Sequence, residues 1–583
     1  MTLLLEAEAP PMRKHRGRWL FLGALLLFFA WVGWCAHLVT SAKSDLQLAQ
    51  SELKNLTDKD SLKSLLDGDR QPLLDAQARL HSAKSNLGSP MLSVARPLPF
   101  LGRQISSARA LTGTASGVLD AAVETSRELA PDKRSGMTQI QLLDTLAVGS
   151  KRMTTAIDKG DLGPASGLLV SLSNGRADLA RELLKLRKPL DRMNLATPGL
   201  RHMIVGPTKL LVVAANNAQM AAGSGLPLAV TTADIVDGHI TVGEFKPNGT
   251  VVVPDDAVQL TPELQQLWAF ASPQTAISRA IVTPRFDVSA TILAAQYGAA
   301  TNTQVDGVLL IDIVGLQKLV AVGGASADPN AIPADKIIDE LMHNQYLSLD
   351  DSQPDINVQR RERLGQVART AVTDLLNPNL SVVDLGRALS ESAAGRHVLL
   401  WSRLPDEQIA LQALRVDGGL AADSVSVSLL NAGRNKLDWF TKMASKVTVG
   451  PVANNERQID VEVTVSTQVP DGLSNIVAGP SVPVAEYGDY IGYFTINVPG
   501  SATKMHLGDA SPVIVAGPDG PTRTIGQLLI VKRNTSRVVT FSFALPADFP
   551  AIRIEPSGRY PAVDWTSATQ SWTDDRVKTI LLS

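Results

Sequence analysis

The sequence is poor in cysteine, in aromatic residues and in surplus positive charge. Its single cysteine, Cys35, cannot form a disulfide within the chain, and a multi-thiolate zinc site is excluded for the same reason. Aromatic residues make up only 4%, which argues against stacking platforms for single-stranded nucleic acid. The formal net charge is −2 and no basic stripe follows the N-terminal segment, so we expect no nucleic-acid partner.

The sequence also lacks the short motifs of common catalysts. It contains no G-x-x-x-x-G-K-[ST] nucleotide loop, no G-x-S-x-G nucleophile elbow and no H-E-x-x-H zinc motif. The histidines stand singly, without the spacing of a metal-ligand pair. No catalytic residue can be assigned on this basis, no metal or cofactor is expected, and the sequence leaves open whether the protein is an enzyme.

One long apolar run is present, from Trp19 to Val39, and it contains no Asp, Glu, Lys or Arg. As a helix it would be about 31 Å long, close to the roughly 30 Å hydrocarbon core of a bilayer. Basic residues at 13–18 precede it, which predicts a cytoplasmic tail at 1–18, a single transmembrane helix at 19–39 and an extracytoplasmic remainder. The alternative is a cleaved signal peptide, but the length of the run favours an uncleaved anchor in the lipid bilayer.

Beyond this run the hydrophobic pattern changes twice. Residues 40–200 place Leu, Ile and Ala at helical spacing, notably in 71–87 and 138–157, which predicts a helical stalk or bundle. In residues 201–445 strand-like and helix-like runs alternate, as in a layered α/β domain. Residues 446–583 hold short β-branched runs at roughly 10-residue spacing, typical of a β-sandwich. We therefore expect an α+β multidomain chain with one transmembrane helix.

Four local patterns within 201–445 are specific enough to test. Residues 209–216 read as a strand, and Asp237-Gly238 predicts a two-residue hairpin turn. The near-continuous apolar run 304–316 predicts a strand that is buried on both faces. The glycine-rich residues 221–225 indicate a tight turn, or alternatively a backbone nest for an anion.

Two polar groups in the α/β region are candidate ligand-binding sites. Asn216, Asn217 and Gln219 follow a strand, where α/β proteins place ligands, although these side chains could instead cap the strand and its turn. The second group contains two arginines that could hold a pyrophosphate and two carboxylates that could hold a divalent ion on the same phosphates. Its members are Arg279, Arg285, Asp306 and Asp312. The alternative for this group is a set of structural salt bridges, with Asp306 marking only a turn.

A third, secondary candidate group lies in a polar stretch between two strand-like runs. It consists of Asn435, Lys436 and Asp438. The stretch is dense in side-chain amides and charges, as a binding loop would be. A structured turn explains the same composition.

Together these motifs carry a family resemblance. They are the apolar anchor, the segment 95–105 (ARPLPFLGRQI), Asn216–Gln219, Val305–Asp312, His397–Ser402, Pro405–Gln408, Asn435–Asp438 and the C-terminal β region. In this order they resemble the actinobacterial membrane-anchored proteins that carry domain of unknown function 4012. Family members usually have Glu and Arg followed by Gly-Gly after the first asparagines, whereas this chain has Gln219, Ala221 and Ser224-Gly225.

A more distant similarity is to the LytR–CpsA–Psr phosphotransferases, which also place an α/β domain after a membrane anchor. It implies work on cell-envelope glycopolymers. Our first hypothesis is a binding or scaffold role in envelope or exopolysaccharide assembly. The alternatives are a phosphotransferase that moves lipid-linked glycan, the only case in which Mg²⁺ is expected, and a glycan-binding module in the C-terminal region. The expected partners are the bilayer and a lipid-linked glycan or cell-wall polymer; the oligomeric state is not indicated.

Overall fold

The computed structural model describes residues 70–88, 99–130, 133, 136–323, 332–347, 365, 367, 369, 382–479, 482–508 and 511–582. The predicted membrane helix at 19–39 and the tail at 1–18 lie outside these residues. Within the described residues, no helix is both long enough and apolar enough to cross a membrane. The chain divides into two compact units, one ending at Ile204 and one whose described part begins at Val205.

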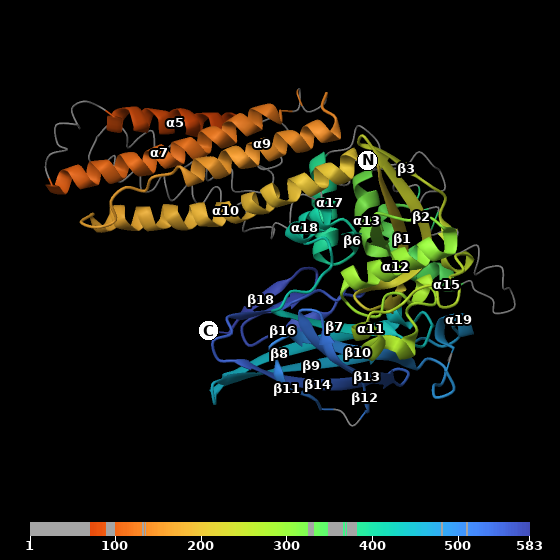
Figure 1. Cartoon of the computed structure of the whole chain (residues 1–583). Helices are drawn as coiled ribbons and strands as arrows, with labels where there is room; N and C mark the ends of the chain where they lie inside the picture. The colour runs from red at the N-terminus through yellow and green to blue at the C-terminus, as the bar shows by residue number, and fades with distance from the viewer. Residues whose placement is uncertain are drawn as a thin grey trace. The chain divides into compact units, whose positions relative to one another are not determined.

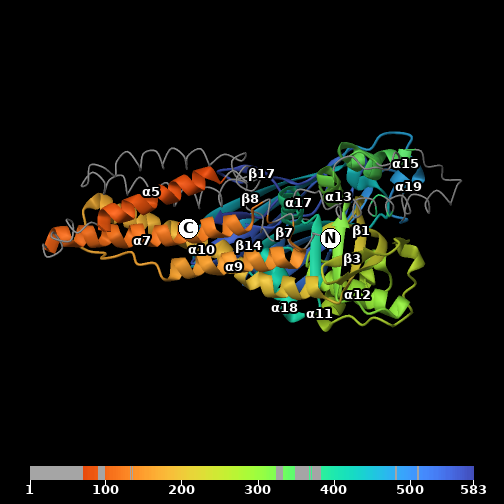
Figure 2. The same cartoon turned by 90° about the horizontal axis from the view of Figure 1, so that it is seen from above.

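The N-terminal unit is helical. Its described helices are α5 (Gln71–Gly88), α7 (Pro99–Glu128), α9 (Gln139–Asp158) and α10 (Val170–Val205), which run side by side (Figures 1 and 2). Leu80, Leu111 and Leu119 are fully buried between them. Thr138 and Gln141 close a capping box that starts α9. The helices predicted at 71–87 and 138–157 are therefore confirmed.

The second unit opens with a mixed sheet. Its described strands are β1 (Thr208–Ala221), β2 (Ser224–Val236), β3 (His239–Val242), β4 (Lys246–Pro247), β5 (Gly307–Asp312) and β6 (Val398–Ser402). Their order is β3-β2-β1-β5-β6, with β4 beside β2; β1 and β5 are parallel and the other pairs are antiparallel. The predicted hairpin joins β2 to β3, with positive φ at both Asp237 and Gly238.

Helices cover both faces of this sheet. The larger ones described are α11 (Pro262–Trp268), α12 (Phe286–Thr301), α13 (Ile313–Gly323), α17 (Val382–Ala394) and α18 (Pro405–Leu414). Phe286 and Leu293 of α12 share one core cluster with Leu211 and Val213 of β1. Helices α13 and α17 pack together over the other face of the sheet (Figure 2).

The rest of the second unit is built from two further sheets. One contains β12 (Val513–Asp519), β13 (Thr522–Val531), β10 (Tyr490–Pro499), β7 (Ser424–Asn431), β15 (Ala551–Ile554) and β18 (Lys578–Leu581) in that order. The other contains β11 (Thr503–Leu507), β14 (Ser536–Pro546), β9 (Glu456–Thr467), β8 (Thr441–Ala453), β16 (Asp564–Thr566) and β17 (Ser571–Thr573). Both are mixed, because β7 with β15 and β8 with β16 pair in parallel.

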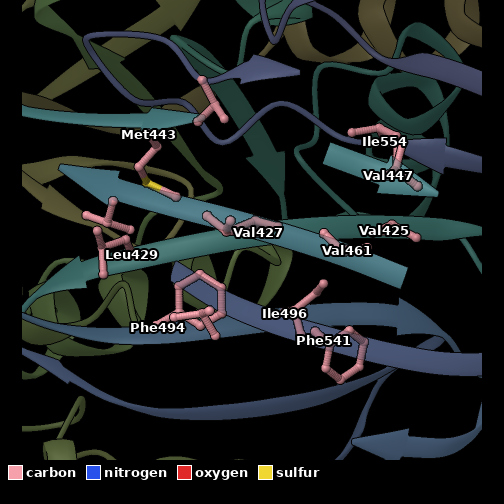
Figure 3. Close-up of a cluster of buried hydrophobic side chains, with 14 of the residues drawn as sticks. Val425, Val427, Leu429, Met443, Val447, Val461, Phe494, Ile496, Phe541 and Ile554 are labelled. Carbon is pink, nitrogen blue, oxygen red and sulfur yellow. The ribbon is translucent and has the colours of Figure 1, made fainter. Parts of the chain in front are cut away.

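These two sheets share one hydrophobic core (Figure 3). Val427 and Phe494 come from the first sheet, and Val461 and Phe541 come from the second. Side chains on a strand alternate between faces, so every second residue of the β-branched runs enters this core. The runs that the sequence predicted as strands in this region are strands in the structure.

The structure confirms an α+β chain with a helical N-terminal region, and it corrects one element. The apolar run 304–316 was predicted to be a single strand, but strand β5 ends at Asp312 and helix α13 begins at Ile313. A continuous apolar run carries no period that would separate the two. The part that is a strand is buried throughout, as predicted. Strand β7 and the first residues of β8 precede residue 446, so the two later sheets also use residues from the predicted α/β region.

Candidate functional site

Strands β1 and β5 are parallel neighbours, and β5 ends beside the interior of β1. Strand β1 was predicted to end at Asn216, but it continues to Ala221, so the first predicted group lies within it rather than after it. Ala215 lies opposite Asp312, so Asn216 and Asn217 follow directly beside that carboxylate. The pairing of β1 with β2 shifts register between Asn216 and Met220, which is a β-bulge. A bulge frees residues from the ladder and re-aims their side chains. The first predicted group therefore turns away from β2 and toward other elements.

Asp312 is the centre of a buried polar cluster at this sheet end. Its Oδ2 accepts a hydrogen bond from Nδ2 of Asn217 at 2.7 Å and lies 2.7 Å from Nδ1 of His397. Its Oδ1 accepts from the backbone N–H of Gly315 at 2.9 Å, so the carboxylate also caps the first turn of α13. Asn217 Oδ1 accepts from the N–H of Ile313 at 3.2 Å. All the side-chain oxygens in this cluster are thereby engaged.

Asn216 and Asn217 each reach a distant segment. Nδ2 of Asn216 donates to the carbonyl of Leu341 at 3.2 Å and to the hydroxyl of Tyr346 at 2.9 Å. Leu341 belongs to the π-helical turn η6 (Glu340–Asn344), and its carbonyl also accepts from Nε2 of Gln345. Nδ2 of Asn217 donates to the carbonyl of Gly558 at 3.1 Å. The two amides thus fasten β1 to elements on both sides.

Gln219 meets the third predicted group. Nζ of Lys436 donates to Oε1 of Gln219, and the N–H of Met220 donates to Oδ2 of Asp438 at 2.9 Å. Asn435 lies in the same turn and accepts from Nδ2 of Asn431 at 3.1 Å. The first and third predicted groups, which lie more than two hundred positions apart in the chain, are therefore in direct contact.

Asp438 is the most heavily bonded residue of this contact. It lies in the short helix η7 (Leu437–Phe440) and is fully buried. Its Oδ1 accepts from the hydroxyl of Tyr490 at 2.8 Å and from Nη2 of Arg559 at 2.9 Å, and its Oδ2 accepts from Asn431 at 2.8 Å. Burial, with Asp438 beside it, raises the pKa of Tyr490 well above its usual value. Burial alone would lower the pKa of Arg559, but Asp438 and Tyr490 together outweigh it and the pKa is raised.

We call this set of bonded residues the junction network, because it joins the end of the mixed sheet to the two later sheets. It comprises Asn216, Asn217, Gln219, Asp312, His397, Asn431, Asn435, Lys436, Asp438, Tyr490 and Arg559, all of which are buried. Since the network lies within one compact unit, its bonds fix the mixed sheet and the later sheets as one body. Buried polar networks that are well satisfied rigidify a fold.

The turn between β1 and β2 is held from outside by backbone contacts. Gly223 has a φ of 76°, which confirms the tight turn predicted at 221–225. Gly558 has a φ of 66°, and a Cβ there would lie 2.6 Å from the carbonyl oxygen of Gly223. Arg396 donates to the carbonyls of Pro284 and Gly418 beside the same turn, and burial lowers the pKa of its guanidinium. Main-chain atoms and the guanidinium of Arg396 thus lie against the turn at 221–225. An anion-binding backbone nest was the alternative prediction for this turn.

The second predicted group is not assembled at one place. Asp306 precedes β5 and Asp312 ends it, so the strand separates them by roughly 20 Å. Asp306 accepts from the N–H of Lys209 at 2.9 Å and pairs with Arg403, as the alternative of a turn at the strand entrance implies. Arg279 lies in η4 (Ile277–Arg279) and donates to the hydroxyl of Thr275 at 3.4 Å.

Arg285 is a structural ion-pair centre. Its guanidinium lies 3.1 Å from Glu263, 3.1 Å from Asp519 and 3.2 Å from Asp287. Burial opposes the charge, but the carboxylates outweigh it and raise the pKa of Arg285. Asp519 ends β12 and is itself held by Thr283 at 2.8 Å and by Asn497 at 2.8 Å. These contacts match the salt-bridge alternative for the group rather than a convergent pyrophosphate clamp.

The remaining points concern metal-binding side chains and the network residues that the sequence did not indicate. Within the described ranges, no cluster of three or more His, Cys, Asp or Glu side chains has the geometry to hold a metal ion. Sequence reasoning missed the parts that His397, Tyr490 and Arg559 play. The order of motifs had drawn attention to the segment beginning at His397, whereas Arg559 stands in a loop between β15 and β16 with no local signal.

Comparison with known proteins identifies one matching region. Residues 205–346 match a family model described as a protein of unknown function, DUF4012. The matched region contains β1, the bulge, β5 and Asp312, but it ends before His397 and the later members of the junction network. Searches of curated proteins and of solved structures find no match to this chain.

Proposed function

We propose that the protein is anchored in the cell membrane by residues 19–39, with its N-terminus in the cytoplasm and its bulk outside. We propose that it serves there as a binding or scaffold protein in the assembly of the cell envelope or of an exopolysaccharide. The membrane part rests on the uncharged apolar run and the basic residues before it. The resemblance to actinobacterial membrane-anchored proteins that carry domain of unknown function 4012 suggests the setting; the match at 205–346 supports the presence of that domain.

The observation that carries the scaffold role is the use made of the candidate ligand residues. In α/β proteins the carboxyl ends of the strands usually face a ligand. Here Asn217 and Asp312 occupy that position, and they bond to His397, Gly315 and Gly558 of the same chain. Through Asp438 the same network reaches Tyr490 and Arg559. The chemistry of these residues supports a rigid body that presents its outer surfaces to partners.

A reporter fusion tests the membrane part of this proposal. An alkaline phosphatase, which is active only outside the cytoplasm, and a fluorescent protein that matures only inside would each be fused after Ser583 in the full chain. We expect phosphatase activity and no fluorescence. Deletion of residues 19–39 should release the chain from the membrane fraction. Fluorescence with an inactive phosphatase would reject the envelope role.

A ligand test separates the scaffold role from the phosphotransferase alternative. The full chain in detergent would be heated with and without a polyprenyl pyrophosphate and Mg²⁺. A phosphotransferase should melt at a higher temperature as lipid is added, because binding to the folded state stabilises it. The scaffold proposal expects no shift beyond that given by the polyprenyl alcohol. Under the phosphotransferase alternative Arg279→Ala should reduce any shift. The substitution should not itself unfold the chain, because Arg279 is exposed and makes a 3.4 Å hydrogen bond to Thr275 but no ion pair among the described residues.

A further inference from the structure

The outer face of one of the later sheets is hollowed by a groove. Its lining residues come from β8, β9 and β14 and from the β11 end of the sheet. These strands are consecutive neighbours in the sheet (Figure 1). Its volume is about 270 Å³, just below the roughly 300–1,000 Å³ of pockets for larger small molecules. The lining residues that matter here are Lys446, Asp460, Glu462, His506, Thr540 and Ser542. We call this surface the outer groove.

The register of the strands places these side chains in two rows. In one row Lys446 lies opposite Glu462, which lies opposite Thr540. In the other, Asp460 lies opposite Ser542, which lies opposite His506. Directly opposite residues have their Cβ atoms about 5 Å apart, so each row is a continuous line of polar groups. The intervening residues of the same strands point inward to the core in Figure 3.

The polar groups of the outer groove have few partners within the protein. Among the described residues, the side chains of Lys446, Glu462 and His506 make no hydrogen bond and no ion pair. Asp460 accepts one bond, from Nε2 of Gln458 at 2.7 Å. Lys446 and Glu462 are opposite neighbours and still do not pair, so an ammonium and a carboxylate are both available at the surface.

Glycine keeps the β11 end of the groove open. Gly508 follows β11 and donates its N–H to the carbonyl of Thr540 at 2.8 Å. A Cβ at this position would overlap Oγ1 of Thr540. Any larger residue would therefore displace a side chain of the groove wall.

We propose that the outer groove binds a neutral, hydroxyl-rich glycan. Carboxylates and hydroxyls accept hydrogen bonds from sugar hydroxyls, while Lys446 and the serine and threonine hydroxyls donate to sugar oxygens. Three inter-strand spacings give the groove a length of about 14 Å, which suits a short stretch of a polysaccharide. This inference rests on the proposed envelope role, because that is the setting that supplies such polymers.

Other ligand classes fit the groove less well. A polyanion would meet the carboxylates of Asp460 and Glu462 in the middle of the surface. A peptide that adds a strand would pair along the free edge of β11 rather than lie across the face of β9 and β14, which are each paired on both sides. A multivalent cation would need three converging ligands, and the described residues offer no such group. The mixed and nearly balanced charge favours a neutral ligand.

Binding to defined oligosaccharides tests the proposal. The full chain, held in a detergent without a sugar headgroup, would be titrated by thermophoresis with neutral oligosaccharides of glucose, galactose, mannose and arabinose. We expect at least one of them to bind. The double substitution Asp460→Asn with Glu462→Gln should weaken that binding about tenfold or more, because hydrogen bonds to charged groups are lost.

The matched control is Lys442→Gln against Lys446→Gln. Both lysines are exposed on the same face of β8, but only Lys446 lines the groove. Lys446→Gln should weaken binding and Lys442→Gln should not. The proposal is overturned if no neutral oligosaccharide binds, if the double substitution binds as well as the unmodified chain, or if hyaluronan binds more tightly than every neutral sugar. If the reporter fused after Ser583 is extracytoplasmic and any of these three results is obtained, the groove proposal is rejected. The proposed membrane location then still stands.

Discussion

The junction network and the outer groove are both dense in polar side chains, yet they differ in burial and in the number of hydrogen bonds that these side chains make. Asp438 is fully buried and accepts hydrogen bonds from Met220, Asn431, Tyr490 and Arg559. The side chain of Glu462 is exposed on a sheet face and has no hydrogen-bond or ion-pair partner among the described residues. Sequence reasoning pointed to the first cluster as a ligand site; for the C-terminal region it offered a glycan-binding module as an alternative, without naming the residues of the outer groove.

The difference teaches that density of polar residues does not by itself mark a binding surface. A buried polar group must be satisfied within the protein, because an unpaired one costs free energy. Most polar atoms of the junction network are therefore bonded within the protein, although Oδ1 of Asn431 and Nε of Arg559 have no partner among the described residues. On a solvated face, water satisfies the same groups, and a ligand can replace that water. Four predictions test this contrast, in order of decreasing effect.

Removal of the buried carboxylate should have the largest effect. Asp438→Ala leaves Arg559 buried without its anion, so we expect the free energy of unfolding to fall by about 3–5 kcal/mol. Urea unfolding of the full chain, followed by tryptophan fluorescence, would measure it. Asp471→Ala is the matched control, because Asp471 also pairs with an arginine but is 94% exposed. Should Asp438→Ala fail to fold, Asp438→Asn provides the milder comparison. Equal losses at both aspartates would contradict the contrast.

Arg285→Ala should come second. The substitution leaves Asp519, which is 1% exposed, without its cation, although Thr283 and Asn497 still donate to that carboxylate. We expect a loss of about 2–4 kcal/mol of stability, with or without a lipid pyrophosphate. Arg279→Ala, at an exposed arginine that was predicted for the same site, should change stability little. A normal melting temperature for Arg285→Ala would show that its ion pairs are dispensable.

The third prediction concerns pH. Burial, aided by Asp287, raises the pKa of Asp417 to about 6. Because the folded state holds this proton more tightly than the unfolded state, the resulting stability is fully present below about pH 4 and is lost as pH rises through about 6. The side chain in Asp417→Asn does not titrate. As pH rises from 4 to 8, the free energy of unfolding of this variant should therefore increase relative to that of the unmodified chain by roughly 2–3 kcal/mol. Parallel stability curves for the two proteins would reject this origin.

The smallest effect is expected in the outer groove. Glu462→Gln should leave the free energy of unfolding within about 0.5 kcal/mol of the unmodified value, since the side chain is exposed and unpaired among the described residues. The same urea experiment measures it. A much larger loss would mean that the carboxylate holds the sheet together, and the contrast with Asp438 would then disappear.

Local patterns predicted much of the fold. The helix at 138–157, the turn at Asp237-Gly238 and the alternation in β8 and β9 all follow from signals among neighbouring residues. The end of β5 at Asp312 was missed, because an apolar strand ran into an apolar helix without a change of pattern. No local pattern indicated that β7 would lie between β10 and β15 in the sheet.

The candidate site was predicted less well, and the reason is distance along the chain. The sequence selected Asn217 because it follows a predicted strand, Asp312 as a carboxylate grouped with two arginines, and Asp438 as part of a polar stretch between two strand-like runs. It could not show that Arg559 would neutralise Asp438, or that Arg285 would be surrounded by Glu263, Asp287 and Asp519. Such partners are chosen by tertiary packing, which no short spacing encodes.

The bond from Asn217 to Gly558 sets an order of assembly. Its donor and acceptor are separated by 341 positions, and synthesis delivers the donor first. Until the loop after β15 has been synthesised, Asn217 lacks the carbonyl of Gly558 as an acceptor, and the turn between β1 and β2 lacks the same loop as a neighbour. Contacts of such long range slow folding, because the chain must close a large loop before the bond forms. A polypeptide truncated before residue 558 would therefore carry every strand of the mixed sheet and still lack the piece that closes it.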